Sequence, residues 1–435
     1  MAIVLANRKE ISPARLAAFN ILQQVETGAF SSILLAAEEP RLMTADRALV
    51  HELVLGVLRW QLFLDKIVEH FAKRRIEDPA VRIALRLGLY QLRFLTRIPA
   101  SAAVNESVSL VRLARLSSAT GFVNAVLRSA IREPDYDPAK DIPDPLERIS
   151  IRTSHPQWLI ERWARSFGIQ EAESFAEANN LVPPTAFRVV KVRANESEVL
   201  SKLRSAGATV EPSRVAAGAW RVSGATALVR ELSAAGELYL QDEASQRVAE
   251  VLDVKPNERV LDLCAAPGGK TTLMAGRAED NALIIAADRS ATRMDTVISI
   301  TNLHGLKSIK PLLLDAGEKL PFASNAFDKV LLDAPCSGTG TLRRNPEIRW
   351  RLTENDIGTF AENQRMFLAN AAEVVTPGGR LVYSTCSVER VENEEVMEEF
   401  VARDDRFKLL TTERTWPHRD GSDGFFIGVF ERLAA

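Results

Sequence analysis

The sequence is poor in the residues that build disulfide frameworks and zinc sites. It holds three cysteines, at positions 264, 336 and 386, and five scattered histidines, with no C-x-x-C pair. An odd number of distant thiols implies no disulfide framework, and the spacing supplies no set of zinc ligands. We therefore expect free thiols, a reducing compartment and no bound metal.

Long hydrophobic runs are missing as well. No apolar stretch approaches the ~20 residues of a membrane helix, and the start MAIVLANRKE places apolar residues before its charges, the reverse of a signal peptide. Internal repeats and low-complexity tracts are also lacking. We expect a cytoplasmic protein without membrane contact, a monomer, and about three domains at roughly 150 residues each.

The small net charge of −2 hides an asymmetry along the chain. Residues 1–132 carry 18 Lys and Arg against 11 Asp and Glu, a net of +7, so the remainder carries a net of −9. A basic module on an acidic body points to nucleic acid. The ordinary alternative is a set of arginines on solvated helix faces.

Three segments make up the first half. Apolar residues in 1–132 recur at helical spacing, which predicts an all-α bundle. Residues 133–149 are rich in proline and acids and predict a linker. Residues 150–235 mix helical and strand patterns, so we expect a small helical and α+β middle region.

Residues 236–435 alternate short apolar runs with helical segments. This pattern predicts an α/β domain of Rossmann-like form with a mostly parallel sheet. Thr353 and Asp356 have the spacing of a capping box and predict a helix that runs toward Val374. In such sheets ligands lie at the carboxyl ends of the strands.

A glycine-containing turn follows the first strand of this domain. Its glycines allow close approach of a ligand to the backbone, and the following helix offers N–H groups to an anion. The dinucleotide pattern G-x-G-x-x-G is missing, and a phosphate loop would need glycine at position 264. A carboxylate-bearing nucleoside such as S-adenosylmethionine remains, with a nucleoside triphosphate or an ordinary tight turn as alternatives. The candidate cofactor residues here are Cys264, Ala265, Ala266, Pro267, Gly268, Gly269 and Lys270.

Four acids stand at successive predicted strand ends: Asp262, Asp288, Asp315 and Asp333. We expect Asp288 to accept hydrogen bonds from ribose hydroxyls, as acids at this position do in dinucleotide folds. Asp315 is placed to accept from an adenine amine, and Asp333 from the edge of a nucleobase. Singly, each residue is more often part of a turn or cap, but four acids at successive strand ends favour a functional site.

Two of the three thiols, Cys336 and Cys386, lie in Ser-, Thr- and Gly-rich segments after predicted strands. A thiolate that adds to carbon 6 of a pyrimidine makes carbon 5 nucleophilic, which methylation at carbon 5 requires. The spacing does not decide which thiol attacks. The ordinary alternative is a small buried apolar residue.

An arginine-rich segment follows Cys336. Arg343, Arg344, Arg349 and Arg351 surround Trp350 and are candidate RNA contacts, because arginine neutralises phosphate and an indole stacks on bases. Surface charges around a core tryptophan are the alternative.

Several motifs together resemble a known family. LDLCAAPGGKTT, DAPCSGTGTLRRNPEIRW, STCSVERVENEEV and DGFFIGVFER resemble the NOL1/NOP2/Sun family of RNA cytosine-5 methyltransferases. The helical start, with DRALVHELVLGVLRW, LRLGLYQLRFL, AVNESVSLVR and GFVNAVLR, is similar to the NusB-type RNA-binding domain.

The resemblance implies a class I methyltransferase fold with S-adenosylmethionine as cofactor. It implies methylation of carbon 5 of a cytosine in small-subunit (16S) ribosomal RNA, either free or in an assembly intermediate. It further implies that Cys386 is the nucleophile, that Cys336 assists product release, and that Lys270 lies near the catalytic Asp333. A non-catalytic RNA-binding factor and a methyltransferase acting on transfer RNA or DNA are the competing hypotheses.

Overall fold

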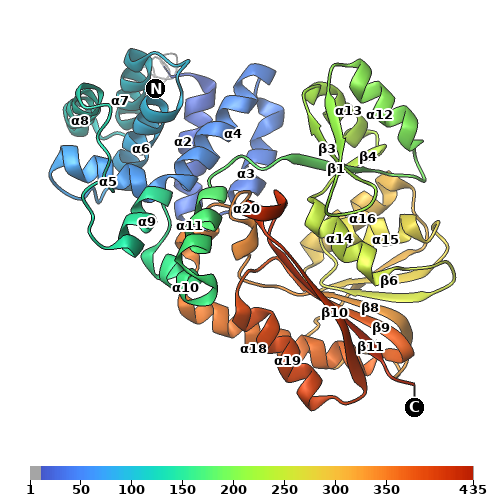
Figure 1. Ribbon diagram of the computed structural model, residues 1–435. Helices are drawn as coiled ribbons and strands as arrows, with labels where there is room; N and C mark the ends of the chain where they lie inside the picture. Colours follow the sequence, from blue (N-terminus) through green and yellow to red (C-terminus); the bar gives the residue numbers. More distant parts are fainter. Residues whose placement is uncertain (1–10, 435) are drawn as a thin grey trace. The chain divides into compact units, whose positions relative to one another are not determined.

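The computed structural model describes residues 11–434, which form two compact units (Figure 1). Unit 1 holds the chain up to Leu181 together with the segment Leu342–Arg351. Unit 2 holds Val182–Thr341 and the chain from Leu352 onward. Within the described residues, no helix is both long and apolar enough to cross a membrane.

Unit 1 is helical, which confirms the predicted bundle. Between residues 11 and 181 its described elements are helices and short 3-10 turns. They are α2 (Pro13–Glu26), α3 (Ser31–Glu38), η1 (Glu39–Arg41), α4 (Thr44–Arg59), α5 (Gln61–Ala72), α6 (Pro79–Phe94), α7 (Ala100–Leu113), η2 (Ser117–Ala119), α8 (Thr120–Arg132), α9 (Pro145–Thr153), α10 (Gln157–Phe167) and α11 (Ile169–Ala178). Helix α9 begins inside the predicted linker because Asp144 caps it and Pro145 occupies its first turn.

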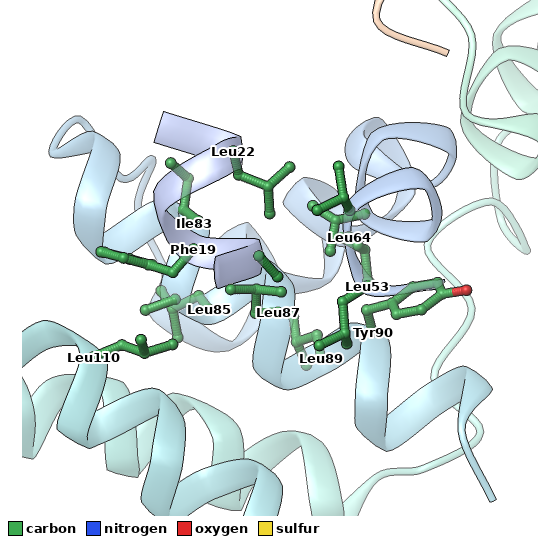
Figure 2. Close-up of a cluster of buried hydrophobic side chains, with 14 of the residues drawn as sticks. Phe19, Leu22, Leu53, Leu64, Ile83, Leu85, Leu87, Leu89, Tyr90 and Leu110 are labelled. Atoms are coloured by element: carbon green, nitrogen blue, oxygen red, sulfur yellow. The ribbon is translucent and has the colours of Figure 1, made fainter. Parts of the chain in front are cut away.

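Helix α6 forms the centre of the unit 1 core. Asp78 caps it by accepting from the Val81 N–H, and Pro79 starts it. Its residues 80–91 are buried except for Arg82, so most of its circumference lies within the core (Figure 2). Gly88 permits close packing, since a Cβ there would lie 2.8 Å from Ser107 Oγ.

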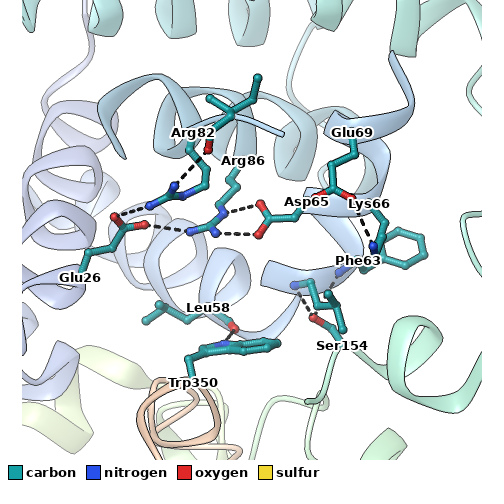
Figure 3. A network of polar contacts seen from close by, with 12 residues as sticks. Glu26, Leu58, Phe63, Asp65, Lys66, Glu69, Arg82, Arg86, Ser154 and Trp350 are labelled. Atoms are coloured by element: carbon teal, nitrogen blue, oxygen red, sulfur yellow. Dashed lines mark hydrogen bonds and ion pairs between the residues drawn. The ribbon is translucent and has the colours of Figure 1, made fainter. Parts of the chain in front are cut away.

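The segment Leu342–Arg351, which includes α17 (Ile348–Arg351), packs among the ends of unit 1 helices. The Trp350 Nε1–H donates to the Leu58 carbonyl, 2.8 Å away near the end of α4 (Figure 3). Glu347 accepts from the N–H and hydroxyl of Ser31 at the start of α3. A carboxylate at a helix N-terminus is stabilising, because it meets unpaired N–H groups and the positive end of the dipole.

Arg349 anchors this segment to helix C-termini. Its Nη1 lies 3.3 Å from the Arg59 carbonyl, 3.1 Å from the Ser154 carbonyl and 2.9 Å from Asn180 Oδ1. Its Nη2 lies 3.3 Å from the Asn179 carbonyl. These oxygens lie at or next to the ends of α4, α9 and α11, where carbonyls lack intrahelical partners and cations are favoured.

Unit 2 contains a small antiparallel sheet of strand order β2-β3-β1-β4. Its elements are β1 (Thr185–Val189), α12 (Glu196–Ser205), β2 (Thr209–Pro212), β3 (Ala219–Ser223), α13 (Thr226–Ala234) and β4 (Leu238–Leu240). The middle region predicted for 150–235 is therefore divided: its helices up to Leu181 belong to unit 1, and its strands belong to unit 2.

The second sheet of unit 2 has seven strands in the order β10-β11-β9-β8-β5-β6-β7. Strands β9 to β7 along this order pair in parallel, whereas β10 and β11 pair antiparallel, which confirms a mostly parallel sheet. The elements are α14 (Glu243–Leu252), β5 (Arg259–Leu263), α15 (Gly269–Arg277), β6 (Leu283–Asp288), α16 (Ala291–His304), β7 (Ile309–Leu313), β8 (Phe327–Asp333), η3 (Thr339–Thr341), α18 (Glu354–Glu373), β9 (Val375–Thr385), η4 (Arg390–Glu392), α19 (Glu394–Arg403), β10 (Phe407–Thr415), α20 (Pro417–Asp420) and β11 (Phe425–Arg432). The predicted capping box of α18 is confirmed.

Alternation along each strand separates two cores on the two faces of this sheet. In β8, Val330 and Leu332 pack with α18 and α19, while Leu331 packs with α14, α15 and α16. Asp333, two residues beyond Leu331, therefore lies on the α15 face. The same period places Asp262 of β5 on that face.

We expect Arg349→Ala to lower the free energy of unfolding by about 3 kcal/mol, because it leaves several buried acceptors without a donor. Urea unfolding of the full chain measures this loss, with Arg97→Ala at an exposed position as the control. An unchanged unfolding midpoint would contradict the anchoring role.

Candidate active site

The turn between β5 and α15 lies where the strand order reverses, since β6 and β8 flank β5 on opposite sides. Ligands of such sheets bind at this point. Cys264 and Gly268 both have positive φ, of 62° and 102°, and the second is the N-cap of α15. The first N–H groups of that helix have no intrahelical acceptor and suit a carboxylate.

The side chain of Cys264 is not a nucleophile. Burial raises the pKa of this thiol, and the negative charges of Asp333, Asp288 and Asp262 raise it further. The thiol therefore stays protonated at neutral pH, and a protonated thiol is a weak nucleophile. Cys264 therefore contributes to the shape of the turn, and the candidate nucleophiles are the other two cysteines.

Two acids on the α15 face border this turn. Asp288 ends β6, is 3% exposed, and accepts from the N–H groups of Ala266 and Ser290. Asp262 is buried and accepts from the Thr271 hydroxyl at 2.6 Å. Burial raises the pKa of Asp262 to about 7. Its other oxygen has no partner among the described residues, which leaves an acceptor beside the cofactor turn.

Asp315 follows β7 and is partly exposed. Its Oδ1 accepts from the Gly317 N–H at 2.9 Å, which fixes the carboxylate in a turn. The other carboxylate oxygen keeps its lone pairs for an external donor.

Asp333 and Lys270 form an ion pair at the end of β8. Lys270 Nζ lies 2.7 Å from Asp333 Oδ2, and the Ser384 hydroxyl donates to Oδ1 at 2.7 Å. Burial by itself would lower the pKa of Lys270, but the charge of Asp333 and the hydrogen bond to it outweigh burial and raise it. Lys270 is therefore an ammonium at neutral pH.

The two remaining thiols meet. Cys336 Sγ and Cys386 Sγ lie 3.4 Å apart, although 50 residues separate them. Strands β8 and β9 are parallel neighbours with Asp333 opposite Ser384, so the loops that follow them begin side by side. The hydrogen bond with Cys386 is the largest cause that raises the pKa of Cys336, and burial adds to it.

A buried carboxylate, Glu392 of η4, lies behind these loops, and sequence reasoning did not single it out. It accepts from the Ser337 N–H and hydroxyl and from the Ser387 hydroxyl. Gln364 of α18 donates to it at 3.0 Å. Glu392 stands in an acid-rich stretch that is equally typical of the start of a helix, so no sequence signal distinguishes it from its neighbours.

The structure overturns the prediction that Arg343 and Arg349 contact RNA. These two residues are 3% and 0% exposed, and both Nη atoms of Arg349 donate to protein oxygens. Arg351 donates to the carbonyls of Val25, Gly28 and Ala29, in the last turn of α2 and just after it. Arg351 and Arg344 are both partly exposed. RNA contact by Arg344 and Arg351 stays a prediction.

Comparison with known proteins places this site in a family. Residues 249–431 match the family of the 16S rRNA methyltransferase RsmB/F, and residues 12–132 match the NusB family. Residues 155–228 match the ferredoxin-like domain of RsmF/B-like methyltransferases. The chain is 33% identical to a probable ribosomal RNA small subunit methyltransferase B of Bacillus subtilis, over 96% of this chain and 98% of that protein. The chain belongs to the ribosomal RNA small subunit methyltransferase B family.

Other members and structures agree with this assignment. The family member of Pseudomonas putida is 35% identical over 97% of this chain and 99% of its own length. The crystal structure of PH0851 superposes with a TM-score of 0.83 at 30% identity, covering 97% of this chain and 99% of that one. The family uses S-adenosylmethionine, and the turn fits this cofactor: a helix N-terminus faces it, and Asp262 offers an unpaired buried oxygen. Within residues 11–434, no cluster of three or more His, Cys, Asp or Glu could hold a metal ion.

The raised pKa of Asp262 predicts a pH-dependent stability. An acid with a raised pKa binds its proton more tightly in the folded chain, so between about pH 4 and 7 this group makes stability fall as pH rises. From pH 5 to 7, the free energy of unfolding of Asp262→Asn should rise relative to that of the wild type by up to about 1.4 kcal/mol per pH unit. Urea unfolding at several pH values tests this, with exposed Asp405→Asn as control; parallel curves for Asp262→Asn and wild type would contradict it.

Proposed function

We propose that this protein methylates carbon 5 of a cytosine in small-subunit (16S) ribosomal RNA through a transient bond between Cys386 and carbon 6 of the base. The observation that carries the proposal is the thiol pair, 3.4 Å apart and next to the ion pair of Lys270 and Asp333. A purely RNA-binding protein has no need of two adjoining thiols at the strand ends of a cofactor fold.

S-adenosylmethionine, when bound, supplies an electrophilic methyl group on a sulfonium. The N–H groups at the start of α15 would hold its carboxylate. Asp288 would accept from its ribose hydroxyls, and Asp315 would accept from its adenine amine. Asp262 and the turn residues Cys264 to Lys270 would line the same site.

The chain's own residues then activate the base. The Cys386 thiolate forms a bond to carbon 6, and the electrons of the C5–C6 double bond move toward carbon 5 and the N3 edge. Lys270 stabilises the negative charge that develops on that edge, and the Asp333 carboxylate accepts from the exocyclic amine beside it, within a site fixed before the reaction. Carbon 5 would then form a bond to the methyl group of the bound cofactor, and the electron pair of the broken S–CH3 bond would stay on the cofactor sulfur.

Release then restores the aromatic base. The carbon 5 proton leaves to a base, and its bonding pair re-forms the C5–C6 double bond and expels the Cys386 thiolate. Cys336 is the nearest candidate for this base, after its own proton has passed to solvent once Cys386 is bonded to carbon 6. The sulfur of Cys386 carries no negative charge in the adduct, so the hydrogen bond that most strongly raises the pKa of Cys336 is weakened.

The position and class of the product test the proposal directly. We expect bisulfite mapping of 16S ribosomal RNA, incubated with protein and S-adenosylmethionine, to show one cytosine newly protected from conversion. Naked RNA and assembly intermediates serve as separate substrates. Methylation confined to transfer RNA or DNA, or none in any substrate, would overturn the assignment.

The two thiols should differ in the intermediate that they trap. Cys336→Ala should accumulate an RNA–protein adduct stable to denaturing electrophoresis, because attack by Cys386 proceeds and release slows. Cys386→Ala should abolish both methylation and adduct, and the double variant should match it. An adduct that accumulates in Cys386→Ala would reverse the two roles.

A further inference from the structure

The Glu392 carboxylate contacts both thiol-bearing loops, those that follow β8 and β9. It is 0% exposed, and four donors surround it: the Ser337 N–H at 2.9 Å, the hydroxyls of Ser337 and Ser387 at 2.5 Å each, and the Gln364 amide at 3.0 Å. Ser337 directly follows Cys336, and Ser387 directly follows Cys386. Glu392 therefore connects the two loops at the residues that directly follow the two cysteines.

The charge of Glu392 is stabilised without a cation. Within residues 11–434, no Lys or Arg forms an ion pair with it. The Ser337 N–H and the Gln364 amide can only donate, so they favour the ionised carboxylate. Burial raises the pKa of Glu392, and the hydrogen bonds from Ser337, Ser387 and Gln364 oppose that rise.

The surroundings of the two thiols have opposite charge. Glu392 accepts two hydrogen bonds from Ser337, next to Cys336, and one from Ser387, and its negative charge is among the causes that raise the pKa of Cys336. Lys270 lies on the Cys386 side, and the charge of Cys386 is among the causes that raise the pKa of Lys270. Tyr383 of β9 also packs here, and its hydroxyl donates to the Glu392 carbonyl.

From this arrangement we propose that Glu392 is a positioning residue that sets the roles of the two thiols. Its carboxylate holds the loops at contact distance and keeps the shared proton on Cys336, so that the thiolate forms on Cys386 beside Lys270. The Cys336 S–H then donates to the Cys386 sulfur across their 3.4 Å contact. The inference rests on the proposed function and explains why only one of two adjacent cysteines attacks the base.

Alkylation without RNA tests this independently of methylation. Iodoacetamide reacts with thiolates, and mass spectrometry reports its product at each cysteine. In the wild type we expect Cys386 to react at least tenfold faster than Cys336. Glu392→Gln keeps the size of the side chain but removes its charge, and it should reduce this ratio at least threefold while methylation slows at least tenfold and S-adenosylmethionine affinity is kept.

Two further variants separate charge from packing. Glu392→Asp restores the charge with a shorter side chain and should recover most of the alkylation ratio, which a merely structural role would not do. Glu398→Gln removes a charge from the exposed side of α19 and should leave the ratio unchanged.

Several outcomes would overturn the role of Glu392. Faster alkylation of Cys336 in the wild type would do so even if Glu392→Gln fails to fold. An unaltered ratio in folded Glu392→Gln would do the same. The expected alkylation pattern without any methylated cytosine would instead overturn the proposed function and leave the charge arrangement standing.

Discussion

The parallel pairing of β8 with β9 is the constraint on which the site depends. Each strand delivers its last residues to the same edge, so Asp333 and Ser384 lie opposite each other and the following loops start together. Residues distant in sequence thereby meet without long side chains or large movements. Parallel strands need crossover helices, and α18, which supplies Gln364, makes this crossing. The element that connects the strands therefore also supports the chemistry at their ends.

The charged groups at the carboxyl ends of these strands are not evenly distributed, because each group lies on one particular face of the sheet. The α15 face presents Asp262, Asp333 and the Lys270 ammonium to the cofactor turn. The loops after β8 and β9 are joined instead by the Glu392 carboxylate, which forms no ion pair with a Lys or Arg among residues 11–434. Electrostatic interactions are strong in such water-poor surroundings. A modest asymmetry of charge therefore suffices to make two chemically identical thiols unequal.

Sequence patterns predicted the fold and the residues of this edge because their signals are local. Apolar periodicity, the capping box at Thr353 and the acid after each apolar run depend on neighbours within a few positions. The two antiparallel strands at the sheet edge escaped prediction because β11 pairs with β9, which is distant in sequence. The role of Glu392 escaped prediction because it too depends on distant partners, Ser337 and Gln364. Arg349 misled for a different reason: a guanidinium suits any cluster of oxygens, and helix-terminal carbonyls attract it as phosphates do. Only the burial of the side chain distinguishes an arginine that binds carbonyls from one that binds phosphate.

The insertion of Leu342–Arg351 into the helical unit bears on how the chain is made. A ribosome delivers helices α2 to α11 well before this segment, so until it emerges the ends of α4, α9 and α11 have no Arg349 to satisfy their oxygens. Strands β5 to β8 are synthesised in the interval. Completion of the first unit thus waits for translation of much of the second, which couples the maturation of the two halves in time.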